Sequence, residues 1–191
     1  MTRLLAFDTS GPDIALAVIN GDALEVMSEH KPRGQGEVLF QHCEALLGGQ
    51  GLTWHDLDGI GVGVGPGNFT GIRIAVSAAR GLALGLGIPA IGVSRFETTQ
   101  VLSASSRTAV PAPRGQFYVF APDKMQEPAL AEHLNDGEFA RSDAYDADAH
   151  IAELAKTAAG RLGQDLPPPK PLYVKPADAA PPRDAPPELI D

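Results

Sequence analysis

Residues 59–87 read GIGVGVGPGNFTGIRIAVSAARGLALGLG, and this stretch predicts a strand, a glycine-rich turn and a helix in direct succession. Glycine alternates with isoleucine or valine over 59–64, so one face of the predicted strand is apolar and the other is bare backbone that another element can approach closely. The turn follows at 65–67. Asn68 is then a good N-cap, worth ~1 kcal/mol over alanine, for a helix that runs to about residue 86.

The predicted helix carries two stripes of side chains at helical spacing. The first is apolar and is expected to face the core; it comprises Ile72, Val76, Ala79, Ala83 and Leu86. The second consists almost entirely of small residues: Ile74, Ser77, Ala78, Gly81 and Gly85. A glycine in a helix interior costs about 1 kcal/mol against alanine, so Gly71, Gly81 and Gly85 require compensation through close packing. The surface that packs there is either the chain's own sheet or another protein, and the sequence leaves both open.

The elements on either side of this stretch give an informative order. The expected strands lie at 4–9, 14–19, 24–28, 59–64 and 90–93, and the expected helices at 35–47, 69–86 and 95–104. Asn20-Gly21, between the second and third strands, is a strong hairpin signal, which makes the first three strands an antiparallel meander. A meander followed by α-β-α-β-α, with parallel strands and intervening helices, is typical of ribonuclease-H-like or actin-like α/β domains. We predict this fold class, with residues 1–104 as the first lobe.

The pattern weakens beyond residue 105. The segments that still suggest structure are a hairpin from 108–110 and 116–120, a helix at 149–162 and a short strand at 172–174. We predict that residues 105–176 form a reduced second lobe. Residues 177–191 are rich in proline and are expected to form a tail.

Composition limits the class of protein. The chain has 191 residues and a formal net charge of −9, which argues against a nucleic-acid grip by this chain alone, because such binding relies on clustered lysine and arginine. Its single cysteine, Cys43, lies in an apolar helical pattern and suits a reducing compartment. The N-terminal apolar run is too short for a signal peptide, and no stretch approaches the ~20 apolar residues of a membrane span. We therefore expect a cytoplasmic protein with no membrane association.

Candidate catalytic residues are few. Asp8 ends the first predicted strand, where ribonuclease-H-like nucleases and actin-like kinases place a metal-binding or phosphate-side carboxylate; the alternative is that Asp8-Thr9-Ser10 caps a turn. The histidines show neither HxxxH nor HExxH spacing, and no serine lies in a G-x-S-x-G context, so neither a metal site nor a hydrolase triad is supported. The glycine-rich turn lacks the lysine of a P-loop and is a weak nucleotide signal. We expect no catalytic residue, no metal and no cofactor.

Three segments together resemble the bacterial TsaB (YeaZ) family of glycoprotease-like proteins. They are FDTS at 7–10, GVGPGNFTGIR at 63–73 and PLYVKP at 171–176, and the match is specific over the first hundred residues. The resemblance implies an actin-like fold and a non-catalytic role in making N6-threonylcarbamoyladenosine in tRNA. It implies the paralogue TsaD as a heterodimer partner that holds the metal and performs the transfer, the ATPase TsaE as a further member of the assembly, and contact with tRNA only through the complex.

The resemblance also separates this chain from its catalytic paralogue. That paralogue carries G-V-N-H-x-x-x-H after the strand that follows the glycine turn, and its histidines hold the metal. The corresponding stretch here is GVSRFETT at 92–99, which puts Arg95 and Thr99 where those histidines fall.

The family's dimerisation surface is formed by the helices predicted at 35–47 and 69–86. The implied interface residues are Leu39, Cys43, Phe69, Thr70, Arg73, Ile74, Ser77, Ala78 and Gly81. Apart from the resemblance, the end of the first strand and the glycine turn give a set of candidate nucleotide-side residues: Asp8, Thr9, Ser10, Gly65 and Gly67. The alternatives that stay open are a glycoprotease-like hydrolase, an actin-like nucleotide-binding enzyme and a self-associating homodimer.

Overall fold

The structure of the protein is a computed structural model that describes residues 1–174. Its larger sheet has five strands in the order β3-β2-β1-β4-β5. The bounds are β1 Arg3–Asp8, β2 Asp13–Asn20, β3 Ala23–His30, β4 Gly59–Gly63 and β5 Ala90–Val93. The first three strands are antiparallel, whereas β4 and β5 run parallel to β1. The predicted meander and the parallel strands after it are confirmed.

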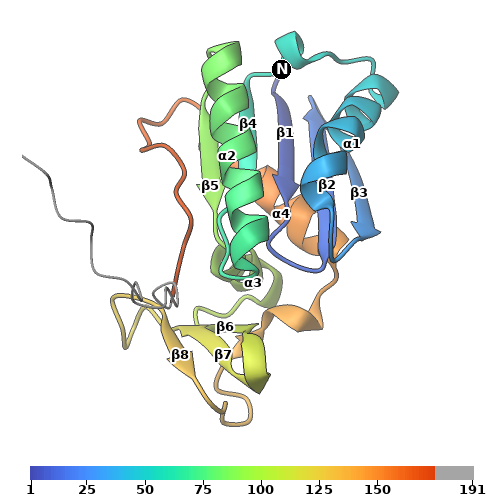
Figure 1. Ribbon diagram of the computed structural model, residues 1–191. Coiled ribbons are helices and arrows are strands. Elements are labelled where there is room, and N and C mark those ends of the chain that lie inside the picture. Colours follow the sequence, from blue (N-terminus) through green and yellow to red (C-terminus); the bar gives the residue numbers. More distant parts are fainter. Residues whose placement is uncertain (175–191) are drawn as a thin grey trace, which may run out of the picture.

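Helices cover both faces of this sheet (Figure 1). One face is covered by α1 Gln35–Gly49 and α2 Phe69–Leu86, which share an apolar core with the sheet that includes Leu5, Phe7 and Ile72. The other face is covered by α4 Ala147–Ala159, whose Leu154 and Ala158 pack with side chains such as Leu4. Alternate residues of β1 therefore face two separate cores, as expected for a strand in the middle of a covered sheet.

The alternating glycines of β4 let α4 lie close to the sheet. A Cβ atom on Gly61 would lie 2.9 Å from the Cβ of Ala158 and 3.2 Å from Leu154 Cδ2, and one on Gly59 would lie 2.6 Å from Leu162 Cδ2. The bare face of the strand predicted from the sequence is thus confirmed. The element that approaches it belongs to this chain and comes from nearly a hundred residues further on.

A second, smaller sheet forms the lower part of the molecule in Figure 1 and has the order β8-β7-β6-β9. Its strands are β6 Thr108–Pro111, β7 Phe117–Phe120, β8 Ala129–Ala131 and β9 Ala140–Arg141, and α3 Arg95–Ser103 leads into it from the larger sheet. Single 3-10 turns occur at Trp54–Asp56, Pro113–Gly115 and Ser142–Ala144. The predicted hairpin is confirmed as β6 and β7, whereas β8 and β9 were not predicted because they are too short to show a periodic pattern.

Two predictions about the second half of the chain are wrong. The second lobe does not comprise all of 105–176, because α4 returns to the larger sheet and packs on β1, β2 and β4. Residues 172–174 form no strand; they belong to an extended segment held by one backbone hydrogen bond, from Leu172 N to Val64 O at 2.8 Å. The predicted boundary at 176 and the proline-rich tail at 177–191 lie outside the described residues.

The sequence-based statement about membrane spans also needs correction. Among residues 1–174, α2 is long and apolar enough to cross a membrane by length and composition alone, with a mean hydropathy of 1.3 over 18 residues. Its packing is nevertheless that of a helix covering a sheet, because Ile72, Val76 and Ala79 are buried against β1 and β4.

Candidate functional site

The glycine turn before α2 is built to pack against the loop that follows β1. Asn68 caps the helix, its Oδ1 accepting a hydrogen bond from Gly71 N at 2.9 Å, as predicted. A Cβ atom on Gly67 would lie 2.3 Å from the carbonyl oxygen of Ser10, and one on Gly71 would lie 1.8 Å from that of Thr9. Thr9 Oγ1 donates to Gly71 O at 2.6 Å. The turn therefore serves close packing within the chain, which offsets the helix cost of Gly71 but not that of the later glycines.

Asp8 lies at the end of β1 and has both carboxylate oxygens engaged. Its Oδ1 accepts from Ser10 N at 2.7 Å, and its Oδ2 accepts from Arg95 Nη2 at 2.7 Å. The residue is 6% exposed, and Gly63 leaves the space that its side chain fills. The interpretation that Asp8 caps a turn is confirmed. Each oxygen of this carboxylate thus accepts a hydrogen bond within the chain, and its charge is paired with Arg95.

Arg95 and Thr99, at the start of α3, both make contacts within the chain. Arg95 turns to Asp8, and the buried Thr99 donates its hydroxyl to Arg95 O at 2.6 Å. Within residues 1–174 no group of three or more His, Cys, Asp or Glu side chains is arranged to hold a metal ion. The side chains of Asp8, Arg95 and Thr99 therefore make contacts that hold β1 and α3 together.

His150 is a buried connection between the two lobes. Its Nδ1 lies 2.8 Å from Thr98 Oγ1 on α3 and its Nε2 lies 2.9 Å from Ser142 O, beside the smaller sheet. Burial, assisted by the positive charge of Arg95, lowers the pKa of His150 to about 4. The imidazole is therefore neutral near pH 7 and acts in packing.

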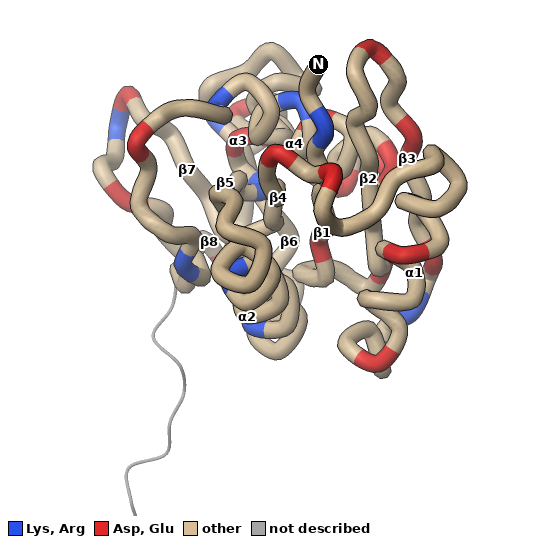
Figure 2. Tube along the Cα trace, turned by 90° about the horizontal axis from the view of Figure 1, so that it is seen from above, with Lys and Arg blue, Asp and Glu red and all other residues tan. Residues whose placement is uncertain are grey.

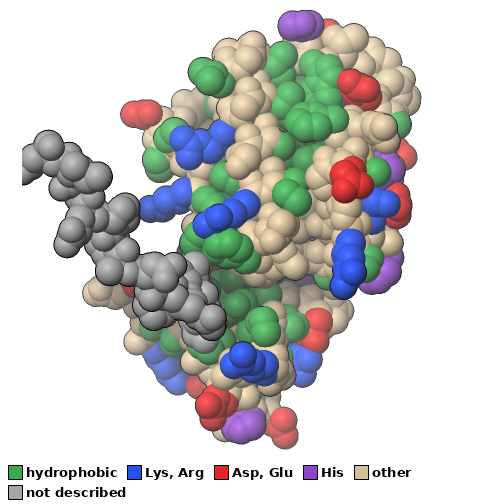
Figure 3. Space-filling view, in the orientation of Figure 1, with side chains coloured by type: hydrophobic (Ala, Val, Ile, Leu, Met, Phe, Trp, Pro, Cys, Tyr) green, Lys and Arg blue, Asp and Glu red, His purple; other side chains and the backbone are tan. Residues whose placement is uncertain are grey.

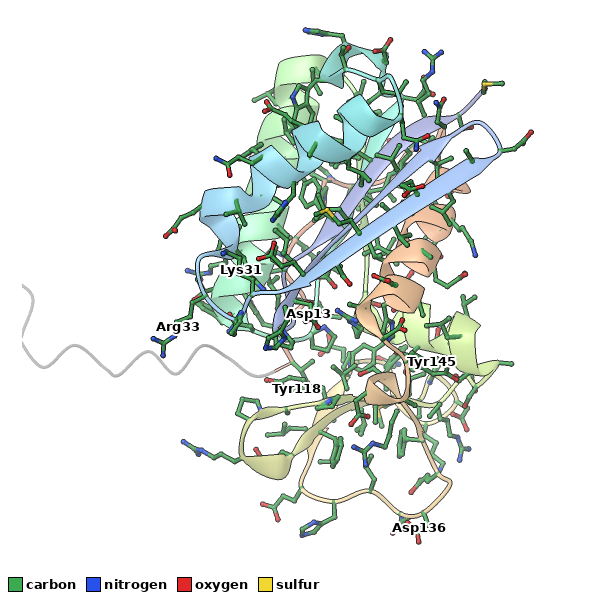
Figure 4. All side chains as sticks on the ribbon, turned by 90° about the vertical axis from the view of Figure 1, so that its right-hand side faces the viewer. Asp13, Lys31, Arg33, Tyr118, Asp136 and Tyr145 are labelled. Carbon is green, nitrogen blue, oxygen red and sulfur yellow. The ribbon has the colours of Figure 1, made fainter. Side chains whose placement is uncertain are left out.

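A cleft of about 820 Å³ lies between the two lobes. Figure 4 shows Asp13 at the edge of the larger lobe, above Tyr118 and Tyr145. Ser10 and Gly67 line the cleft, whereas the other nucleotide-side candidates, Asp8, Thr9 and Gly65, do not. Its charged lining residues are Asp13, Arg95, Asp143 and Asp146, and the arginine is already paired with Asp8. Asp143 is likewise paired with Arg141, and Asp13 lies 2.9 Å from His30. Among the described residues that line the cleft, none offers a phosphate group an unpaired positive charge.

The small-residue stripe of α2 faces away from the chain's own sheet. Ser77, Gly81 and Gly85 are exposed, and a Cβ atom on either glycine would meet no atom of the described chain within 4 Å. The interpretation that this stripe lies on the sheet is therefore wrong for these three residues, whereas Ile74 and Ala78 are half-buried against the core. Nothing within residues 1–174 compensates the helix cost of Gly81 and Gly85.

The stripe lines a groove of about 630 Å³ between α1 and α2. The helices are close at one end, where a Cβ atom on Gly36 would lie 3.4 Å from Ile74, and they diverge toward the other. The groove is lined by Phe40, Glu44, Trp54 and His55 on one side and by Ser77, Ala78, Gly81, Leu82, Gly85 and Leu86 on the other. Figure 3 shows hydrophobic side chains gathered over this part of the face.

Several interface candidates from the sequence lie on this surface. Phe69, Thr70 and Arg73 are exposed on the first turns of α2, and Ile74 and Ala78 are half-buried beside the groove. The sequence did not single out Phe40, which is 45% exposed on α1, or Leu84, which is 87% exposed on α2. Leu84 falls outside the predicted core stripe, and an apolar residue in that position was the signal that could have found it.

Two interface candidates are wrong. Leu39 and Cys43 are 1% and 0% exposed, because the apolar side of α1 faces the sheet. Burial raises the pKa of the Cys43 thiol to about 12, as expected for a thiol that acts as a small core side chain. These residues cannot touch a partner directly. The outward side of α1 presents Phe40 and Glu44 instead.

Comparison with known proteins gives a consistent set of relatives. The model of the family described as "TsaD: tRNA N6-adenosine threonylcarbamoyltransferase" matches residues 32–161. The tRNA threonylcarbamoyladenosine biosynthesis protein TsaB of Escherichia coli K12 is 35% identical over 96 residues, which cover 50% of this chain and 42% of that protein. TsaB of Buchnera aphidicola is 30% identical over 126 residues, covering 60% of this chain and 58% of that protein. The chain thus spans about half the length of the curated relatives it matches.

Solved structures agree on the fold. A protein described as similar to the peptidase YEAZ from Pseudomonas aeruginosa superposes with a TM-score of 0.71 at 23% identity, covering 92% of this chain and all of that one. YeaZ from Pseudomonas aeruginosa superposes with a TM-score of 0.60 at 25% identity, covering 77% of this chain and 73% of that chain. The actin-like α/β fold expected from the order of elements is confirmed.

Proposed function

The chain belongs to the tRNA N6-adenosine threonylcarbamoyltransferase (TsaD) family, as a member of the TsaB (YeaZ) type, and from this premise we propose that it is a non-catalytic docking subunit in the synthesis of tRNA N6-threonylcarbamoyladenosine in the cytoplasm. Its partner in this proposal is the TsaD-type paralogue, which carries out the transfer. The ATPase TsaE joins the assembly, and tRNA meets this chain only within it.

The observation that carries the proposal is the groove between α1 and α2. A helix with two exposed glycines and an 87% exposed leucine is poorly suited to water, because the glycines weaken the helix and the leucine gains nothing from exposure. Both features are explained when a second helix packs into the groove, since small residues allow two helix backbones to approach closely. A paralogue with the same fold offers helices of the same kind.

The centre around Asp8 supports a non-catalytic role. A nuclease, kinase or metal-dependent transferase of this fold needs an available carboxylate at the end of β1, and here that carboxylate is held by Arg95 and by Ser10 N. A subunit without reacting groups assists a reaction by holding its partner's site in a competent arrangement. This is the role that we assign to the chain. A glycoprotease-like hydrolase or an actin-like kinase would need groups that the described residues do not bring together.

The proposal is tested by mixing the chain with the TsaD-type protein of the same organism and measuring mass by light scattering. The expected result is a heterodimer that Gly81→Arg or Ala78→Arg abolishes, because a long charged side chain fills the groove and leaves a buried charge without a partner. The matched control is Gly160→Arg, an exposed glycine at the end of α4, on the opposite face of the larger sheet. A heterodimer that survives both groove variants contradicts the proposal. Self-association of the chain in preference to the heterodimer would indicate the homodimer instead.

A further inference from the structure

Three side chains form an ordered cluster on the surface at the start of α2. Arg73 Nε donates a hydrogen bond to Tyr173 Oη at 2.8 Å, and the guanidinium carbon of Arg73 lies 3.9 Å from the centre of the Phe69 ring. The rings of Phe69 and Tyr173 stack with their centres 5.0 Å apart and their planes at 29°. Both rings are 39% exposed. The Phe69 ring thus holds one face of the Arg73 guanidinium, and the Tyr173 hydroxyl holds its Nε edge, at the surface of the molecule.

The position of Tyr173 is fixed by the segment that precedes it. After α4 the chain runs back along β5, where a Cβ atom on Gly92 would lie 3.2 Å from Pro169 Cβ. Leu172 N then bonds to Val64 O, directly before the glycine turn. This places Tyr173 beside α2, one hundred residues after Arg73 in the sequence. Its contact with Arg73 is therefore built by tertiary structure.

The guanidinium of Arg73 has its outer nitrogens unused within residues 1–174. Like Arg33, Arg80 and Arg114, Arg73 forms no ion pair with a carboxylate of residues 1–174, whereas the other five arginines there each do. Arg73 differs from those three in being held by Phe69 and Tyr173. Its one hydrogen bond uses Nε, which leaves the two Nη groups available as a fork. A stacked guanidinium with an available fork matches the geometry of a carboxylate, and stacking reduces the side-chain entropy that binding costs.

Arg73 lies at the N-terminal end of the row of α2 residues that lines one side of the groove. Arg73, Ser77, Gly81 and Gly85 follow one another at steps of four, so they share one side of α2. The net charge of the chain is −9, yet α2 contains two arginines and no acidic residue (Figure 2). A partner element seated along the groove therefore meets a positive group at the N-terminal end of α2.

We infer that Arg73, positioned by Tyr173, binds the carboxylate of an aspartate or glutamate of the protein that docks on α2. This inference rests on the proposed function and adds the chemistry of the contact. Arg73 supplies the two Nη donors, Phe69 holds the plane of the guanidinium, and the Tyr173 hydroxyl sets its rotation. Tyr173 is a positioning residue, since it acts through Arg73.

The test measures the affinity of the heterodimer by titration at low and high salt. Arg73→Ala should weaken association about tenfold or more, and Arg73→Lys should weaken it about fivefold, because lysine keeps the charge without the fork. Tyr173→Phe keeps the stacking and removes only the hydroxyl, so it should weaken association about threefold. The matched control is Tyr118→Phe, which removes a hydroxyl from the cleft between the lobes. Each variant should keep the melting temperature of the unchanged chain.

The salt dependence of the affinity distinguishes a charged contact of Arg73 from a change in the shape of the docking surface. The affinity of the unchanged chain should fall as salt rises, and the affinity of Arg73→Ala should fall less, because its charged contact is already gone. If Gly81→Arg abolishes the heterodimer but Arg73→Ala and Tyr173→Phe bind like the unchanged chain, the inference is overturned and the proposed function stands. If the unchanged chain forms no heterodimer, both are overturned. Equal salt dependence of Arg73→Ala and the unchanged chain also overturns the inference.

Discussion

The same substitution at two glycines of α2 should have opposite effects on stability. In Gly71→Ala the added Cβ atom lies 1.8 Å from the carbonyl oxygen of Thr9 and 2.9 Å from its carbonyl carbon, so α2 or the loop after β1 has to move. Overpacking of this kind costs about 1–3 kcal/mol or more, and the movement also strains the 2.6 Å bond from Thr9 Oγ1 to Gly71 O. Alanine returns about 1 kcal/mol of helix propensity. Because an approach of 1.8 Å puts the cost at the upper end of this range, we expect a net loss of about 2 kcal/mol in the free energy of unfolding.

In Gly81→Ala the added Cβ atom meets nothing within 4 Å, so only the propensity gain remains. The free energy of unfolding should rise by about 0.5–1 kcal/mol. Urea unfolding of the two variants and the unchanged chain, followed by circular dichroism, measures both shifts under one set of conditions. A loss of stability in Gly81→Ala would show that the small-residue stripe packs within the chain. A gain in Gly71→Ala would refute the close approach of the glycine turn to Thr9.

Three further predictions concern His150, the pair of Arg95 with Asp8, and the metal content of the chain. The pKa of His150 is about 4 in the folded state and 6.5 ordinarily, so between these pH values the unfolded state binds more protons than the folded state. The free energy of unfolding should therefore rise by about 3 kcal/mol from pH 4 to pH 6.5. In His150→Gln, urea unfolding should show a rise that is smaller by this amount. Arg95→Met should cost about 3 kcal/mol by leaving the Asp8 carboxylate buried without its partner, and Asp8→Asn in the same chain should recover much of that loss in thermal unfolding. Elemental analysis of the purified chain should find no stoichiometric zinc or iron, and about one such metal per chain would contradict the non-catalytic assignment.

Local patterns were sufficient to predict most of the fold from the sequence. The glycine–valine alternation of β4, the Asn68 cap and the hairpin signal at Asn20-Gly21 each report on neighbours in the sequence, and each is found in the structure. The strands β8 and β9 have three and two residues, which is too few to show a period. The packing of α4 on the glycines of β4 joins distant segments, and no local pattern reports such a contact.

In the candidate site, too, local patterns were predictable from the sequence and contacts between distant segments were not. The apolar helical pattern around Cys43 agrees with its burial in the core better than the interface role implied by the family resemblance. The pairing of Asp8 with Arg95 joins residues 87 apart, and the contact of Arg73 with Tyr173 joins residues 100 apart. Both depend on the complete fold. The exposed stripe was visible in the sequence, but which surface it faces was not.

The most direct test of the central claim is reconstitution of tRNA threonylcarbamoylation from purified components, leaving out one protein at a time. The TsaD-type protein, the ATPase and this chain are combined with tRNA, ATP and an activated threonylcarbamoyl donor, and the modified nucleoside is scored by mass spectrometry. The account predicts that this chain alone gives no product, that the mixture without it is inactive, and that Gly81→Arg fails to restore activity while Gly160→Arg restores it. Full activity in the mixture that lacks this chain, or modification by this chain alone, would contradict the account.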